Sequence, residues 1–234
     1  MVCHPLVQGE QEITGDPFDP HQLAFRPFFS ALFCFVFSGR KGDQKQQFRM
    51  KPQNASMTSA WTSAGQGVTQ VMNRCESAKS SGFLDLTECS LMYITDAIYL
   101  VLKEYEITKC SLKGNDLKKF PKKMIIRLPE LEVLNLEGNK IDEIPEEIVG
   151  WKETMKGINL AKNQIKSIPD AFLELENIVL LDLSGNAIDD IDENKFFKAF
   201  PNLKQVNLHE NPLSDAKKAA LKAKCPAGVN LRLE

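Results

Sequence analysis

An asparagine returns along this chain at a nearly constant interval, each time inside the same apolar frame, Leu-x-x-Leu-x-Leu-x-x-Asn-x-Ile. Successive aligned positions are 26, 24, 24, 23 and 25 residues apart. Self-similarity at a fixed period of about 20–50 residues predicts a solenoid, in which each copy forms one coil and buries its apolar face against its neighbours. The copies lie at residues 84–91, where the frame is degenerate, and at 107–117, 131–141, 155–165, 178–188 and 203–213.

The frame also predicts how each coil is built. Two apolar residues separated by one position lie on the same face of a short strand, and stacked coils then form a parallel sheet. Each coil turns after its strand, which leaves backbone N–H and C=O groups inside the solenoid in need of partners. A side-chain amide both donates and accepts hydrogen bonds, so a buried column of amides satisfies these groups. We expect this column at Asn115, Asn139, Asn163, Asn186 and Asn211, with Cys89 in the same position of the first coil.

Short helical or 3₁₀ segments are expected to return each coil along the outside of the solenoid. Proline follows the column residue by six positions at Pro121, Pro145 and Pro169. Proline at such a place fixes an extended or helix-starting turn. Apolar side chains behind these prolines, among them Trp151 and Phe172, are therefore predicted to be core.

Both ends of a solenoid need caps, because a bare end exposes its apolar layer. Apolar residues at spacings of three and four from Trp61 to Ala78 predict an amphipathic capping helix at the N-terminal end. At the other end, Ser214 is the expected N-cap of a short helix, and alternation over 229–233 predicts a final strand. The sequence thus predicts a disordered or loosely ordered extension at 1–49, a linker and capping helix at 50–80, repeats at 81–213, and a C-terminal cap at 214–234.

With these repeats the chain resembles the leucine-rich repeat family, in its typical intracellular class. The resemblance covers roughly residues 60–234. It implies an α/β solenoid, a horseshoe of about six repeats with short parallel strands on its concave face. It also implies protein binding without catalytic residues, since related intracellular members scaffold signalling complexes, bind small GTPases or regulate phosphatases. Secreted relatives close both ends with cysteine clusters, whereas here Cys75 and Cys225 stand alone at the two ends, so a reducing, cytoplasmic location is expected.

The register predicts which side chains face a partner. Residues that alternate with the buried pair line the concave face of the sheet. Val133, Gly157 and Leu180 then form an apolar floor flanked by polar side chains, a composition typical of protein-binding surfaces; the alternative is that they are simply strand formers. The expected partner-binding residues are Lys109, Ser111, Val133, Asn135, Glu137, Gly157, Asn159, Leu180, Asp182, Gln205, Asn207 and His209.

Charge is distributed in bands. Residues 109–127 hold seven basic side chains against Asp116, and residues 130–147 hold seven acidic side chains against Lys140. Such bands are either solvated faces or surfaces that steer an oppositely charged partner. The whole chain has 29 Lys and Arg against 31 Asp and Glu, a formal net charge of −2. Because nucleic-acid binding needs a basic excess, no nucleic acid partner is expected.

Other classes of protein fit the sequence poorly. The apolar run at 28–37 is ten residues long, whereas a membrane-spanning helix needs roughly 20, so no membrane partner is expected. His4, His21 and His209 are scattered, and no metal-binding or phosphate-cradling motif occurs. We therefore expect no metal, no cofactor and no catalytic residues.

The leading hypothesis is a monomeric, cytoplasmic, non-catalytic scaffold that binds a protein partner on its concave face, in intracellular signal transduction. One alternative is a regulatory subunit of a phosphatase or of a small GTPase. The other is a secreted recognition domain, whose signs would be cleavage near Gly39 and a glycan on Asn54.

Overall fold

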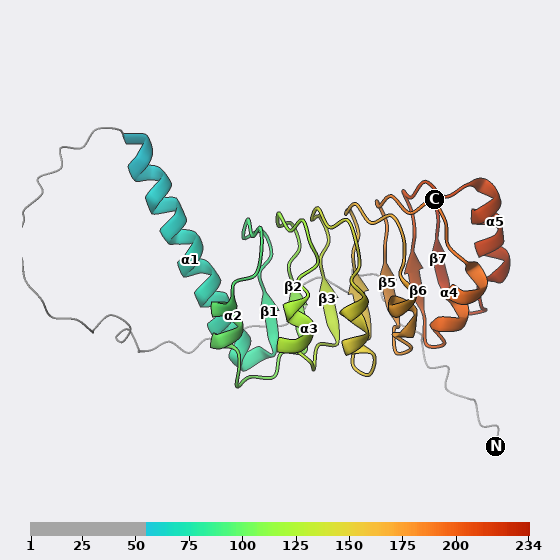
Figure 1. The fold of residues 1–234 in the computed structure, drawn as a ribbon, viewed down its shortest axis with the longest axis horizontal. Coiled ribbons are helices and arrows are strands. Elements are labelled where there is room, and N and C mark those ends of the chain that lie inside the picture. Colours follow the sequence, from blue (N-terminus) through green and yellow to red (C-terminus); the bar gives the residue numbers. More distant parts are fainter. Residues whose placement is uncertain (1–54) are drawn as a thin grey trace, which may run out of the picture. The chain divides into compact units, whose positions relative to one another are not determined.

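The computed structural model describes residues 55–234 of the chain, with side chains described from residue 67 onward. The predicted extension at 1–49 and the predicted glycosylation site at Asn54 lie outside the described residues. Residues 83–232 form one seven-stranded parallel sheet whose strand order follows the chain, from β1 to β7 (Figure 1). The sheet does not close on itself, and this arrangement confirms the predicted α/β solenoid.

Each strand is three residues long, because each coil turns soon after its pair of inward-facing residues. Neighbouring strands pair in parallel and without offset, so Leu84, Cys110, Leu134 and their equivalents form a continuous buried row. Six strands come from the six copies of the repeat and the seventh from the predicted final strand. The strands are β1 (Phe83–Asp85), β2 (Lys109–Ser111), β3 (Val133–Asn135), β4 (Gly157–Asn159), β5 (Leu180–Asp182), β6 (Gln205–Asn207) and β7 (Asn230–Arg232).

Short helices return the coils along the convex side, as predicted. Pro145 and Pro169 directly precede the two 3₁₀ helices in extended conformation, so proline ends the straight part of the coil and starts the turn. Asp192 and Ser214 cap the last two helices by accepting hydrogen bonds from backbone N–H groups of the first turn. The helices are α2 (Asp96–Val101), α3 (Lys123–Arg127), η2 (Glu146–Trp151), η3 (Asp170–Glu174), α4 (Glu193–Ala199) and α5 (Asp215–Lys224).

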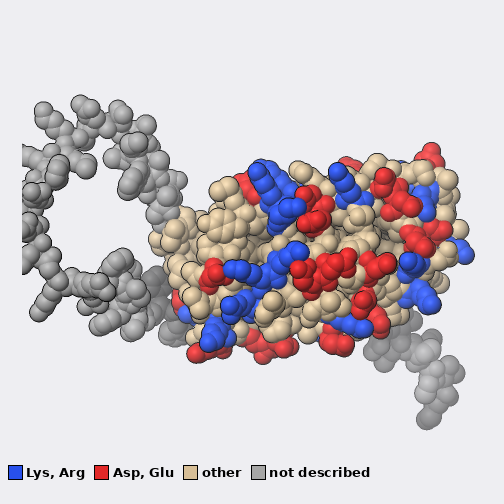
Figure 2. All heavy atoms as spheres, in the orientation of Figure 1, with Lys and Arg blue, Asp and Glu red and all other residues tan. Residues whose placement is uncertain are grey.

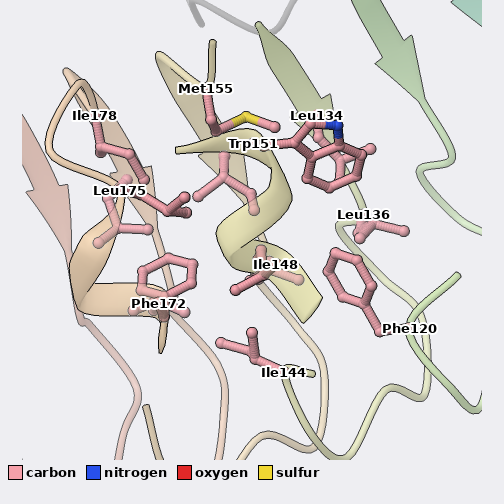
Figure 3. Packing of buried hydrophobic residues seen from close by; sticks show 14 of the residues in the cluster. Phe120, Leu134, Leu136, Ile144, Ile148, Trp151, Met155, Phe172, Leu175 and Ile178 are labelled. Atoms are coloured by element: carbon pink, nitrogen blue, oxygen red, sulfur yellow. The ribbon is translucent and has the colours of Figure 1, made fainter. Parts of the chain in front are cut away.

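The space between strands and helices is filled by one apolar core. Figure 3 shows Trp151 of η2 beside Leu134 and close to Phe120 of the preceding coil. Trp151 is fully buried, and its indole Nε1–H donates to the backbone oxygen of Leu128 at 2.9 Å. Phe172 and Phe200 meet edge to face, with ring centroids 5.9 Å apart. Trp151 and Phe172 are core, as predicted from their position behind Pro145 and Pro169.

The amide column runs through the core beside the sheet. Asn163 shows its chemistry: Nδ2 donates to the backbone oxygens of Leu136 and Leu160, at 3.0 Å each, while Oδ1 accepts from Ile141 N–H. Each amide therefore ties its own coil to the preceding one. The same pattern holds for Asn115, Asn139, Asn186 and Asn211, all of them buried.

Cys89 occupies the corresponding position of the first coil but is only half-buried. Its Sγ reaches the backbone oxygen of Thr87 at 3.6 Å, and its own N–H donates to Oδ1 of Asn115. A thiol suffices there because, within residues 55–234, a helix and not another coil precedes this one, so no preceding coil presents backbone groups that need an amide partner.

The residue before each column member has a left-handed backbone conformation. Gly138 has a φ of 68° and Lys162, its equivalent in the next coil, a φ of 55°. Glycine adopts this conformation without steric cost, whereas a side chain bearing a Cβ does not. Lys162 therefore stands at a position where the turn itself favours glycine.

The N-terminal end of the sheet is covered by α1 (Ala55–Ser81), which begins six residues before the predicted helix at Trp61. Cys75 and Ala78 of α1 are fully buried against the first coil. Arg74 adds polar contacts, because Nη1 donates to the backbone oxygens of Thr87 at 2.7 Å and Asp85 at 3.2 Å. Among the described helices, none has both the length and the apolar character needed to cross a membrane.

Candidate protein-binding face

The predicted partner-binding residues lie in three rows on the concave face: two rows on the strands and a third, with Glu137 and His209, just beyond the strand ends. The first row contains the predicted apolar floor. A Cβ built on Gly157 would lie 3.8 Å from Cγ1 and Cγ2 of Val133 and 3.8 Å from Cβ of Leu180, so the two aliphatic side chains flank the glycine directly. Strand pairing sets the order of this row as Lys109, Val133, Gly157, Leu180 and Gln205.

The second row is more buried than an exposed docking row would be. Asn135 and Asn159 are each 4% exposed, and the Oδ1 of each accepts a hydrogen bond from the backbone N–H two residues further along. The side chains are buried because their oxygens close this local turn. The Nδ2 groups make no hydrogen bond to another described residue and remain as donors. The row is Ser111, Asn135, Asn159, Asp182 and Asn207.

Asp182 differs from its neighbours in the second row because its carboxylate is already engaged. Oδ1 accepts from Ser184 N–H at 2.9 Å and from the Ser184 hydroxyl at 2.6 Å. Oδ2 accepts from Nδ2 of Asn207 at 3.0 Å. This carboxylate therefore has little remaining capacity to accept bonds from a partner.

Glu137, in the third row, lies between two lysines of the adjacent coils. Its carboxylate is 2.9 Å from Nζ of Lys113 and 3.1 Å from Nζ of Lys162, and the side chain is 14% exposed. Burial by itself would raise the pKa of Glu137, but hydrogen bonds and attraction from the two ammonium groups outweigh it and lower the pKa. Glu137 is thus the centre of an ion triad with Lys113 and Lys162 that links three coils. At the C-terminal end of the third row, Nε2 of His209 is 3.3 Å from Glu210, and Nδ1 of His209 is buried without a partner among the described residues.

Two of the three residues on the concave side of β4 and of the turn after it, Gly157 and Ala161, are small. Gly157, Asn159 and Ala161 are all buried, whereas the equivalent first-row residues Val133 and Leu180 on either side are partly exposed. Gly157 has no side chain and Ala161 only a methyl group, whereas Val133 and Leu180 flank the glycine, so we infer a shallow depression along this strand. We call it the β4 recess: a floor of Gly157, Asn159 and Ala161, with walls of Val133, Asn135 and Glu137 on one side and Leu180, Asp182 and Ser184 on the other.

The predicted charge bands lie on adjacent coils and pair with each other. Nζ of Lys119 is 3.0 Å from Asp142, and Nζ of Lys122 is 3.0 Å from Glu147. On the face that Figure 2 shows, basic and acidic groups lie beside one another. Exposed ion pairs stabilise little individually, about 0–1 kcal/mol each, but they partly cancel the field of each band. Lys162 belongs to the ion triad with Glu137 but was not among the predicted partner-binding residues. Its place one coil after Glu137 in the sequence could have indicated this contact.

The described residues contain neither a metal-binding cluster nor an activated thiol. Among residues 67–234 no group of three or more His, Cys, Asp or Glu side chains is placed to hold a metal ion. The described cysteines Cys75, Cys89, Cys110 and Cys225 are free thiols. Burial raises the pKa of each of these thiols above its ordinary value, so none of them is an activated nucleophile.

Comparison with known proteins agrees with this architecture. The family model described as Leucine Rich Repeat matches residues 130–151. No curated protein matches the sequence significantly. Among solved structures, a TLR13–ssRNA13 complex is similar over 65% of this chain and 21% of its own, with 26% identity and a TM-score of 0.51.

A second similar structure is an internalin, InlF, from Listeria monocytogenes str. 4b F2365. It matches 65% of this chain and 41% of its own length, with 17% identity and a TM-score of 0.51. The chain therefore spans less than half the length of these two structures. The repeat match and the solved structures support the leucine-rich repeat family, and the chain has the leucine-rich-repeat solenoid fold.

Proposed function

We propose that this chain is a non-catalytic scaffold of the cytoplasm that binds a protein partner on its concave face, in intracellular signal transduction. Leucine-rich-repeat solenoids generally use their concave surface for binding. The observation that supports this role most directly is the first row, where Val133 and Leu180 are partly exposed and flank Gly157. Aliphatic side chains surrounded by polar ones are typical of the centre of a protein interface.

The thiols support the cytoplasmic part of the proposal. Cys110 is buried in β2 and Cys75 on the inward face of α1, and both are free thiols. A reducing compartment keeps such thiols in that state, whereas small secreted domains generally rely on disulfides.

Proximity labelling in cells, with the full chain fused to a labelling enzyme, tests partner and compartment together. The test variant carries Val133→Lys and Leu180→Lys, which place two charges on the apolar floor. The matched control carries Ile126→Lys and Val149→Lys on the helix side, where both residues are exposed, Ile126 by 80%. We expect the first variant to lose a cytoplasmic set of labelled proteins that the control retains.

The result also separates the proposed role from its alternatives. A set of labelled proteins lost equally from both variants would contradict binding on the concave face. A phosphatase or small GTPase recovered in stoichiometric amount would make the chain a regulatory subunit of that enzyme. Labelling confined to secretory compartments would contradict the cytoplasmic scaffold and favour the secreted recognition domain.

A further inference from the structure

We propose that the β4 recess binds an acidic, extended segment of the partner protein, in which one aliphatic side chain occupies the space above Gly157. This inference rests on the proposed function, since it names the kind of partner that the concave face takes. It follows from three features of the recess: its missing side chain, its unused hydrogen-bond donors and its already engaged carboxylates.

The aliphatic position is set by Gly157. The backbone at this residue is an ordinary strand, and a Cβ there would meet Val133 and Leu180 at 3.8 Å, a normal contact distance. The glycine is therefore not required by the turn or by close packing. Its absent side chain leaves a gap between two aliphatic walls, and a partner's aliphatic side chain buries apolar surface there at about 25 cal/mol per Å².

The unused polar groups of the recess are hydrogen-bond donors. Asn135 and Asn159 are held by their Oδ1 atoms at 2.9 Å from the backbone N–H groups of Glu137 and Ala161, which fixes Nδ2 as the unused end of each amide. The two strands that carry them are neighbours, so these donors lie about 5 Å apart. A partner must supply oxygen acceptors at this level, since a buried donor left without a partner costs about 1–3 kcal/mol.

The carboxylates in the walls do not pair with these donors, because other groups already engage them. Asp182 accepts three hydrogen bonds from Ser184 and Asn207, and Glu137 lies between two ammonium groups. Exposed cations stand near both ends of the recess: Lys109 is next to Val133 in the first row, and Lys162 lies beyond Ala161. Charge complementarity therefore favours Asp or Glu on the partner, not Lys or Arg.

The dimensions suit a short extended segment. From Gly157 to Ala161 the recess extends over four residue steps, about 13 Å for extended backbone. An aliphatic residue above Gly157 then stands about four positions from the Asp or Glu that reaches Lys162. A phosphate backbone would also supply acceptors, but it has no aliphatic group for the gap.

The test selects random short peptides displayed on phage against the full chain and measures the affinity of an enriched, fluorescein-labelled peptide by fluorescence polarisation. Gly157→Val fills the gap without strain. Asn159→Asp keeps the internal hydrogen bond, as Asp182 does at the same level, but replaces the unused donor with a charged acceptor. We expect each change to weaken binding by roughly tenfold or more, because each removes one well-placed contact.

Asn194→Asp is the matched control for Asn159→Asp. Asn194 is exposed in the first turn of α4, and the change adds the same charge on the helix side. It is expected to leave peptide affinity unchanged. Urea unfolding of all variants checks that any loss of binding is not a loss of fold.

Enrichment of peptides with an aliphatic residue and Asp or Glu about four positions away, bound weakly by both recess variants, is the result that supports the proposal. Enrichment of basic peptides, no enrichment at all, or equal binding by Asn159→Asp overturns it. So does tighter binding of a fluorescein-labelled single-stranded RNA that competes with the peptide. The two proposals can fail separately. If the peptide results overturn the recess but the Val133→Lys and Leu180→Lys variant still loses its labelled proteins, the proposed function stands.

Discussion

Oδ1 of Asn163 accepts a hydrogen bond from the backbone N–H of Ile141 at 3.0 Å, across the boundary between two coils. The same side chain donates to a backbone oxygen on each side of that boundary. One amide therefore satisfies buried groups of two coils at once, and this makes the coils a single cooperative unit.

Replacing this amide is expected to be costly. Asn163→Ala leaves the Ile141 N–H without its acceptor, whereas the oxygens of Leu136 and Leu160 keep the hydrogen bonds from Asn139 and Asn186. The free energy of unfolding should therefore fall by about 1–3 kcal/mol. Urea unfolding followed by circular dichroism measures the loss. Asn177→Ala is the control, because Nδ2 of Asn177 also donates to a backbone oxygen, that of Glu153 at 3.2 Å, but at the exposed surface. Equal losses from the two variants would contradict the structural role of the column.

Replacing glycine by alanine is expected to have opposite effects on the free energy of unfolding at a left-handed turn and within a helix. Gly138→Ala forces a Cβ into a φ of 68° and should lower the free energy of unfolding by about 1–2 kcal/mol. Gly67→Ala, in α1 with open space around it, should raise it by about 0.5–1 kcal/mol because alanine favours the helix. Thermal unfolding of the two variants gives the signs, and a shared sign would contradict the turn geometry.

The ion triad predicts a pH-dependent contribution. The pKa of Glu137 is lower in the folded chain than in the unfolded chain, so its stabilising effect is complete above the ordinary glutamate pKa and declines as pH falls through the folded value. Glu137→Gln should therefore lower the free energy of unfolding at pH 7 by about 1 kcal/mol. The difference from the unchanged chain should shrink between about pH 5 and pH 3.

Urea unfolding at several pH values checks this prediction. Glu143→Gln is the control, since Glu143 is 63% exposed and shares Lys119 with Asp142. It should change stability by less than about 0.5 kcal/mol at any of these pH values. A loss for Glu137→Gln that is the same at pH 3 and pH 7 would show that packing, not charge, is responsible.

The thiols are predicted to differ in reactivity. Burial raises the pKa of Cys75 and Cys110 and also blocks access to their sulfur atoms, whereas Cys225 is partly exposed. With iodoacetamide at pH 8, Cys225 should be alkylated first, and Cys75 and Cys110 only in urea. Mass spectrometry of the peptides reports each site. Early alkylation of Cys110 in the folded chain would contradict its place in the core.

Much of the fold could be predicted from the sequence because it depends on local patterns. The pair of apolar residues before each asparagine predicts the strands, and Ser214 predicts the start of α5. The start of α1 was placed six residues too late, at Trp61, because Gly65 and Gly67 weaken a helical pattern without ending it.

The candidate face was predictable in outline only. Alternation places Asn135 and Asn159 on the concave face, but it does not show that their oxygens bind the backbone and that their nitrogens stay unused. Nor does it show that Asp182 is already engaged by Ser184 and Asn207. Those facts depend on the side-chain rotamers and on the neighbouring strand, and neither is set by local sequence.

The sequence alone determined the architecture: the amide at a near-constant interval requires stacked coils, since each amide must serve the coil before it as well as its own. The tertiary structure alone decided what the surface offers. It placed Lys119 beside Asp142, so that the charge bands pair, and it put Gly157 between two aliphatic side chains. The reason is physical: hydrogen bonds within a coil follow from residue order, whereas contacts between coils follow from how closely the strands bring distant residues together.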